Sequence, residues 1–199
     1  MKGLFVMNLR LKTIVYVGIL SAVASVLMIF PHFPIFPAPA DFLDVDFSDV
    51  PALLASVTIN PVAGVIVVLI KNLFHLLQTK TFAVGELSNL ILGSVYALSV
   101  GILARYTFKK TLMKKKLFFV LPIAVIAVII TAALSNFFIV LPFYAKFMPA
   151  LAEVFGKFEF ILTWIVPFNL IKASLQAVVF YLLYRGVGPY VTKNMTHYR

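Results

Sequence analysis

Long apolar runs without charged residues divide the chain into membrane-length segments. They cover residues 13–40, 50–70, 87–104, 117–145 and 160–184. Only Lys172 interrupts the last of them. About twenty apolar residues cross the hydrocarbon core of a bilayer, whereas an ionised side chain at its centre is costly. The pattern therefore predicts an all-α integral membrane protein, with residues 1–199 as a single transmembrane domain.

The composition supports the same class of protein. Hydrophobic residues make up 62% of the chain and charged residues 12%, and the mean hydropathy is +1.05. Soluble domains carry about 25% charged residues. The chain has no cysteine, which excludes disulfides. The first apolar run follows Lys2, Arg10 and Lys12 as in a signal peptide, but it is long for one, so we expect a retained first helix.

The positive residues predict the topology. Lys and Arg gather at the amino end, between Arg105 and Lys116, and at the carboxyl end. The positive-inside rule places these three regions in the cytoplasm. The loops at residues 41–49 and 141–159 contain few or no Lys and Arg and are expected outside. The net charge of +10 follows from this topology, and it implies attraction to anionic lipid rather than a nucleic-acid partner.

The number of helices follows from parity. The Asp cluster is expected outside and the Lys cluster inside, so an odd number of crossings must separate them. Residues 87–108 supply one crossing, which leaves two crossings or none for the stretch 50–79. Asn60 and Pro61 break the stretch 50–79 into two segments. About 30 residues rise roughly 45 Å, short of the roughly 60 Å of two full crossings, so at least one segment is short or tilted. We therefore predict six helices with both termini cytoplasmic. Their expected bounds are about 10–30, 50–59, 61–79, 86–109, 117–141 and 160–185.

Polar residues inside the last two spans are candidates for a binding site, because lipid offers them no partner. Lys172 lies in the middle of the last helix and shares one face with Asn169 and Gln176. Asn136 lies near the outer end of the preceding helix. Amide and ammonium groups among aromatic residues suit a neutral, flat, heteroaromatic solute. The structural alternative is that Glu86 neutralises Lys172 and that the asparagines bridge helices.

Four of the seven acidic residues lie in one short stretch after the first helix. They are Asp41, Asp44, Asp46 and Asp49. One interpretation is a solvated loop that forms an outer lid over a cavity, with Asp49 capping the next helix. The alternative is a divalent-metal site of a membrane enzyme. We favour the lid, because the chain lacks the second acidic cluster or glycine signature of such enzymes.

The first helix carries two pairs of small residues at a spacing that allows another helix to approach closely. Gly18 pairs with Ala22, and Ser21 with Ser25. Internal packing and a partner interface both fit this spacing. The sequence contains no GxxxxGK[ST] loop, so the chain cannot hydrolyse ATP itself and any pumping must be driven by partners.

Four stretches resemble a known family. FLDVDFSDVPALL, NPVAGVIVVLIKNLFHLL, GELSNLILG and PFNLIKA are similar to the riboflavin-specific substrate-binding subunit, or S-component, of energy-coupling factor (ECF) vitamin transporters. The resemblance extends from the first helix to the last. It implies a binding subunit in the cell membrane of a prokaryote that is not an enzyme and has no cofactor. It implies riboflavin as the transported ligand, and leaves FMN or another vitamin open.

The resemblance also implies roles for particular residues. In the family, the ring of the vitamin contacts an asparagine on the fifth helix and an NxxK pair on the sixth, which match Asn136, Asn169 and Lys172 here. The loop after the first helix covers the vitamin. Further candidates for this cavity are Glu86, Asn89, Phe42, Leu43 and Trp164. The transmembrane coupling subunit, which works with two ATPase subunits, docks on small residues of the first helix. The matching residues here are Gly18, Ala22, Ser21 and Ser25.

Overall fold

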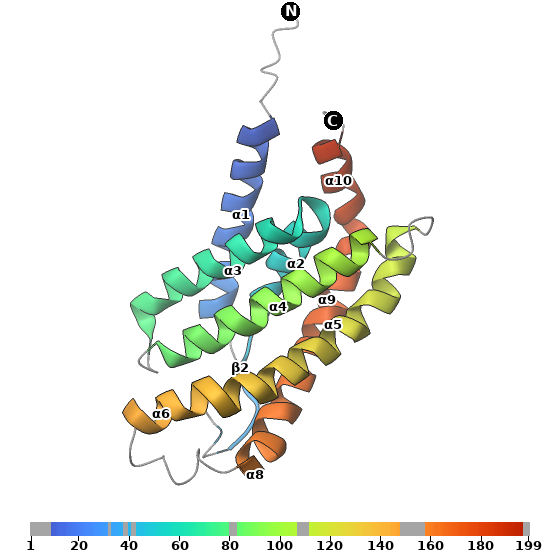
Figure 1. Ribbon diagram of the computed structural model, residues 1–199. Coiled ribbons are helices and arrows are strands. Elements are labelled where there is room, and N and C mark those ends of the chain that lie inside the picture. The colour runs from blue at the N-terminus through green and yellow to red at the C-terminus, as the bar shows by residue number, and fades with distance from the viewer. Residues whose placement is uncertain are drawn as a thin grey trace, which may run out of the picture.

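The computed structural model describes residues 9–31, 33–37, 40, 43–79, 83–106, 112–147 and 158–196. Figure 1 shows a bundle of tilted helices in which α1 begins and α10 ends at the same end of the molecule. The α-helices are α1 (Leu9–Ile29), α2 (Asp49–Thr58), α3 (Pro61–His75), α4 (Val84–Tyr106), α5 (Met113–Ser135), α6 (Leu141–Phe147), α8 (Phe158–Phe160), α9 (Val166–Gly186) and α10 (Gly188–Thr196). A 3₁₀ turn, η1 (Leu76–Gln78), extends α3, and two π-helical turns are η2 (Asn136–Val140) and η4 (Ile161–Ile165).

Five helical segments are long and apolar enough to cross a membrane, within the residues described. They are Arg10–Ile29, Pro61–Gln78, Val84–Tyr106, Lys115–Lys146 and Phe158–Gly186. The remaining predicted helix, 50–59, corresponds to α2, whose 10 residues are too few for a full crossing. This confirms that one of the two segments around Asn60 and Pro61 is short. Asn60 caps α3 by accepting a hydrogen bond from the Ala63 amide, and Pro61 follows at the first helical position.

Helix α2 lies at the centre of the bundle. All ten of its residues are buried, and it contacts α1, α3, α4 and α9. Glycines let the neighbouring backbones approach it closely. A Cβ atom at Gly64 would lie 2.8 Å from the Ala52 carbonyl oxygen and 2.8 Å from the Ser56 Cβ. The short helix therefore acts as the core around which the longer ones pack.

The segment between α1 and α2 enters the bundle. Its strands β1 (Phe33–Pro34) and β2 (Asp44–Val45) form a small antiparallel hairpin, the only sheet among the described residues. The chain then turns inward, where Val45, Asp46 and Ser48 are at most 4% exposed. The prediction that the aspartates keep this segment at the aqueous mouth is therefore wrong for Asp46 and Asp49, which are both buried. Asp41 lies outside the described residues.

The last two spans are longer than predicted. Helix α5 continues through η2 into α6, past Pro142, where we expected it to end. A proline inside an α-helix lacks an N–H donor and collides with the preceding turn. Here two prolines follow a wider π-helical turn, since η2 ends two residues before Pro142 and η4 ends two residues before Pro167; Pro122 lies within α5 itself. The wider turns explain why the helices continue.

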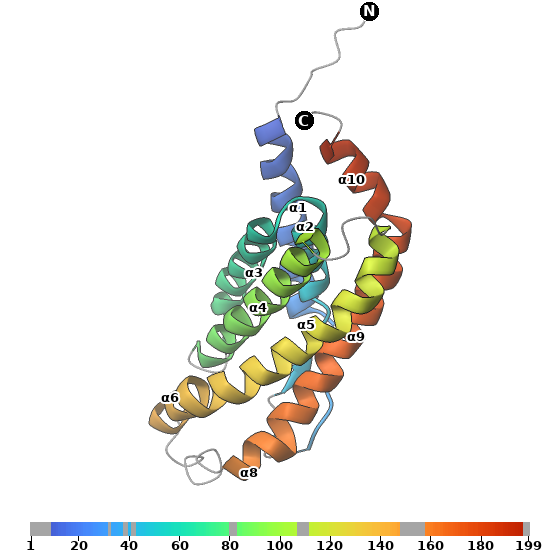
Figure 2. The same cartoon turned by 45° about the vertical axis from the view of Figure 1, so that its right-hand side comes forward.

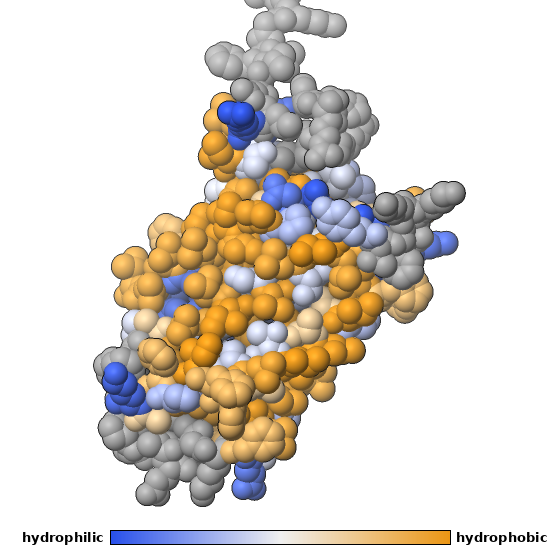
Figure 3. Space-filling view, in the orientation of Figure 1, coloured by the Kyte–Doolittle hydropathy of each residue, from blue (hydrophilic) through white to orange (hydrophobic). Residues whose placement is uncertain are grey.

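Figure 2 shows α5 and α9 side by side along most of their length, in agreement with their contacts. Helix α10, which the sequence analysis did not predict, follows α9 after Val187. The flank of the molecule is covered by hydrophobic side chains, and hydrophilic residues gather toward its two ends (Figure 3). This distribution fits a bundle whose sides contact lipid.

Enlarging Gly64 should destabilise the bundle. A leucine at this position must displace the α2 backbone, and overpacking of this kind costs about 1 to 3 kcal/mol. Gly18→Leu is the matched control, since a Cβ atom at Gly18 would meet nothing within 4 Å. We expect a lower midpoint of thermal unfolding in detergent for Gly64→Leu alone. Equal midpoints for the two variants would contradict the close packing at Gly64.

Candidate ligand-binding site

A cavity of about 380 Å³ lies between the segment after α1 and the helices α3, α4, α9 and η2. Cavities of roughly 300 to 1,000 Å³ are typical of small-molecule sites. Its wall combines apolar side chains with an unusual number of polar ones for the interior of a membrane protein. The polar and ionisable lining residues are Asp44, Asp46, Asp49, His75, Gln78, Glu86, Ser88, Asn89, Tyr96, Asn136, Tyr144, Asn169, Lys172 and Gln176.

Most of the residues predicted from the sequence meet at this cavity. Asn136, Asn169 and Lys172 line it, together with three of the further candidates, Glu86, Asn89 and Leu43. Trp164 is not among the lining residues; its ring packs edge-on against Phe36, with centroids 5.3 Å apart. Phe42 lies outside the described residues. The structure thus gathers the amides and the amine, but not the tryptophan.

The two asparagines are fixed in the same way. The side-chain Nδ2 of Asn136 donates to the Ala132 carbonyl oxygen, and that of Asn169 to the Ile165 carbonyl oxygen, each at 2.8 Å. Both bonds reach one helical turn back; Asn136 is the first residue of η2, and Asn169 lies four residues after the end of η4. Within the described residues neither amide makes a second hydrogen bond, so one N–H and the amide oxygen of each can serve a ligand.

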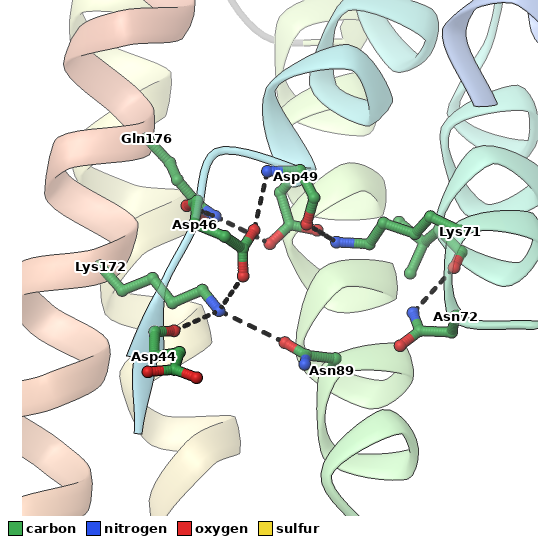
Figure 4. A network of polar contacts seen from close by, with 10 residues as sticks. Asp44, Asp46, Asp49, Lys71, Asn72, Asn89, Lys172 and Gln176 are labelled. Carbon is green, nitrogen blue, oxygen red and sulfur yellow. Dashed lines mark hydrogen bonds and ion pairs between the residues drawn. The ribbon is translucent and has the colours of Figure 1, made fainter. Parts of the chain in front are cut away.

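Lys172 forms an ion pair with Asp46, not with Glu86 as the structural alternative supposed. Its Nζ lies 2.8 Å from Asp46 Oδ2, and it also donates to the Asp44 carbonyl oxygen and, at 3.5 Å, to Asn89 Oδ1 (Figure 4). Burial by itself would raise the pKa of the loop residue Asp46, but the charges of Lys172 and Lys71 and hydrogen bonds lower it to about 2. The carboxyl is therefore ionised at neutral pH.

A second ion pair lies next to the first. Lys71 of α3 is fully buried, and its Nζ lies 2.5 Å from Asp49 Oδ1 and 2.6 Å from Ser48 Oγ. Gln176 joins the two pairs by donating at 3.1 Å to both the Asp46 carbonyl oxygen and Asp49 Oδ2. We call Lys172, Asp46, Gln176, Asp49 and Lys71 the charged row.

The charged row explains why the predicted helix cap is absent. Ser48, not Asp49, is the N-cap residue of α2, and no side chain caps that helix. A buried ammonium without a counter-charge is far more costly than an unmade cap. The Asp49 carboxylate therefore pairs with Lys71 instead of capping the helix. Asp46 Oδ1 accepts a hydrogen bond from the Ser48 amide at 2.8 Å.

Glu86 belongs to a separate group at the α3 and α4 side of the cavity. Its Oε1 lies 2.7 Å from His75 Nδ1, and its Oε2 accepts from Thr79 Oγ1 at 3.0 Å. Among the described residues, no three His, Cys, Asp or Glu side chains are placed to bind a metal ion. Asp46 and Asp49 are engaged by lysines, so the structure gives no support to the metal-dependent enzyme.

The sequence analysis missed Lys71 and His75, although a signal was present. Lys71, His75 and Gln78 are spaced by four and three residues, which places them on one face of a largely apolar helical stretch. Asn169, Lys172 and Gln176 on α9 share a helix face through the same separations of three and four residues.

The small residues of α1 divide between two faces. Gly18 and Ala22 are exposed on the outside of the bundle. Ser21 and Ser25 are 2% and 8% exposed and face inward, and Ser25 Oγ donates to the Ser21 carbonyl oxygen at 2.9 Å. Only the first pair is therefore accessible to a partner, and the inclusion of the serines in the docking face is corrected.

Comparisons with known proteins agree with this architecture. The family model "ECF transporter, substrate-specific component" matches residues 12–184. The chain is 37% identical over 183 residues to the riboflavin transporter RibU of Staphylococcus aureus (strain TCH60), covering 92% of this chain and 93% of the relative. It is 35% identical over 191 residues to the riboflavin transporter FmnP of Bacillus subtilis (strain 168), covering 94% and 97%.

A solved structure of the S component of a bacterial ECF transporter has the same fold. It is similar with a TM-score of 0.74 and 36% sequence identity, over 92% of this chain and 98% of that chain. The match of the family model and the near-complete coverage of the relatives agree with the membrane bundle described above. The chain belongs to the substrate-specific components, or S-components, of energy-coupling factor transporters.

Proposed function

We propose that this chain is the riboflavin-binding subunit of an ECF-type importer, and that the cavity holds the vitamin. As a family member it is a multi-pass membrane transport subunit and not an enzyme. Relatives that match over more than nine-tenths of the chain are riboflavin transporters. The observation that carries the proposal is the meeting of Asn136, Asn169 and Lys172 at one cavity of about 380 Å³.

The chemistry of the cavity supports this ligand. An isoalloxazine ring presents carbonyl oxygens and ring nitrogens along one edge and apolar faces above and below it. Asn136 and Asn169 offer amide donors and acceptors to that edge, and Lys172 offers an ammonium donor. Leu43, Val140 and Phe168 provide apolar surface in the same cavity. The segment from β2 to α2 covers the cavity on one side and acts as its lid.

The topology and partners form a second part of the proposal. Both termini lie in the cytoplasm, and the cavity opens outward, so that the vitamin is captured from outside. The common end of α1 and α10 in Figure 1 supports an even number of crossings. Gly18 and Ala22 contact the transmembrane coupling subunit, and two ATPase subunits supply the energy. The outward position of this pair and the open space beside Gly18 support the contact.

Removing an amide from the cavity should weaken binding of riboflavin. Asn169→Ala leaves acceptors of the ligand unpaired, which costs about 1 to 3 kcal/mol, or roughly tenfold to a hundredfold in affinity. Titration of riboflavin fluorescence with purified protein measures the effect. Asn72→Ala is the matched control, because Asn72 is equally buried but does not line the cavity.

Equal affinity of wild type and Asn169→Ala would remove this asparagine from the binding site. Equal losses for Asn169→Ala and Asn72→Ala would point instead to a general effect on the fold. Lys172 is a poorer probe, since its removal leaves the Asp46 carboxylate buried without its counter-ion.

A bulky residue on the outer face of α1 should separate binding from transport. Gly18→Leu or Ala22→Leu should bind riboflavin normally, because both positions lie on the outside of the bundle and neither lines the cavity. Uptake by cells and co-purification with the energising subunits should fall, because tight packing of membrane helices requires small side chains.

Ser25→Leu is the contrasting variant, because Ser25 is buried within the bundle. It should reduce folding and binding together. Normal uptake by cells that carry leucine at both Gly18 and Ala22 would reject the docking face.

A further inference from the structure

We propose that Lys71 is a positioning residue for ligand binding, although it does not line the cavity. By compensating the charge of Asp49, it leaves Lys172 with a single carboxylate partner, Asp46, and keeps the Lys172 ammonium available to the ligand. The inference rests on the proposed function, in which the cavity holds riboflavin. It assigns a role in affinity to the end of the charged row that lies away from the cavity.

The Lys172 ammonium has one strong contact and two weaker ones. Its Nζ lies 2.8 Å from Asp46 Oδ2, whereas the Asp44 carbonyl oxygen and Asn89 Oδ1 lie at 3.3 and 3.5 Å. The contact with Asn89 is the longest of the three and is directed toward α4 (Figure 4). The N–H group that makes it is therefore the one that a ligand can take over at least cost.

Two routes of contacts connect Lys71 with Lys172. In the first, Lys71 Nζ donates to Ser48 Oγ at 2.6 Å, and the Ser48 amide donates to Asp46 Oδ1 at 2.8 Å. The other oxygen of Asp46 pairs with Lys172. The second route is the charged row itself, in which Asp49 lies between Asp46 and Lys71 (Figure 4). A change at Lys71 can thus reach Lys172 without a contact between the two lysines.

The Asp49 carboxylate is confined to its place in the row. It is 6% exposed, and its Oδ1 lies 2.5 Å from Lys71 Nζ. On the α4 side it lies against Gly93, where a Cβ atom would come within 2.8 Å of the same oxygen. The carboxylate therefore cannot reach water when Lys71 loses its charge.

Without the charge of Lys71, the remaining ammonium of the row is that of Lys172. A buried carboxylate without a counter-charge is costly, so Asp46 and Asp49 would share this ammonium. Sharing draws the ammonium toward α2 and away from α4. The ligand then loses a hydrogen-bond donor, although every residue that it contacts is still present.

The third buried lysine provides a matched control. Lys116 is 7% exposed, and its Nζ donates to the Ala104 carbonyl oxygen at 3.2 Å. No carboxylate among the described residues pairs with it, and it does not line the cavity. Lys116→Met therefore removes a buried ammonium without disturbing the charged row.

Lys71→Met removes the charge with little change of shape. It should raise the dissociation constant of riboflavin about tenfold, the loss expected for one hydrogen bond to the ligand. Fluorescence titration of purified full-length protein measures the effect, and Lys116→Met should keep the wild-type constant. Lys71→Arg keeps the charge and changes the shape, so it should lose less affinity than Lys71→Met. A role in packing alone predicts the reverse order.

A second substitution at Asp49 separates charge compensation from a general effect on the fold. Adding Asp49→Asn to Lys71→Met removes both charges of the pair, and this double variant should regain most of the affinity that Lys71→Met loses. Asp49→Asn alone leaves Lys71 to compete with Lys172 for Asp46, so it should also weaken binding. A purely structural role of the pair would make the double variant the weakest binder of the three.

The outcomes separate this inference from the proposed function. If wild type does not bind riboflavin, the proposed function fails, and the inference fails with it. If wild type binds riboflavin and folded Lys71→Met binds it equally well, the positioning role alone is overturned. The role is also overturned if the double variant binds no better than Lys71→Met, or if Lys116→Met loses as much affinity. If Lys71→Met does not fold, Asp49→Asn decides in its place, and wild-type affinity of that variant overturns the role.

Discussion

Two of the three buried lysines among the described residues, Lys71 and Lys172, are each paired with a carboxylate inside the bundle, and the rest of the site follows from this pairing. An unpaired charge in a low-dielectric interior costs several kcal/mol or more. The two carboxylates come from one short segment, at Asp46 and Asp49. The segment after α1 therefore lies between the helices, although its local sequence predicts a position at the surface. Gln176 joins the two pairs into one continuous row.

The short second helix is a consequence of the same arrangement. The segment that ends at Ser48 is already buried in the bundle, and Asn60 and Pro61 begin the next helix. Only the 10 residues of α2 remain to fill the centre, and all of them are buried. Their small side chains and the facing Gly64 and Gly101 let α3 and α4 pack closely against α2.

The sequence predicts the parts of this structure that depend on local patterns. Apolar runs give the spans, the Asn60 and Pro61 pair gives the break, and helical spacing groups Asn169 with Lys172. It fails where a contact joins distant residues. Asp46 and Lys172 are 126 positions apart, and nothing near Asp46 indicates that it is buried. The prediction that the fifth helix ends before Pro142 is wrong for a related reason, since the π-helical turn that accommodates this proline has no local sequence signal.

Ion pairs in the interior of a protein add little net stability, but they fix the position of the side chains that form them. In this cavity the pairs fix the direction of the Lys172 ammonium and the depth of the segment that carries Asp44 and Asp46. The position of the covering segment and the direction of the ammonium thus depend on the same pair of atoms, Lys172 Nζ and Asp46 Oδ2.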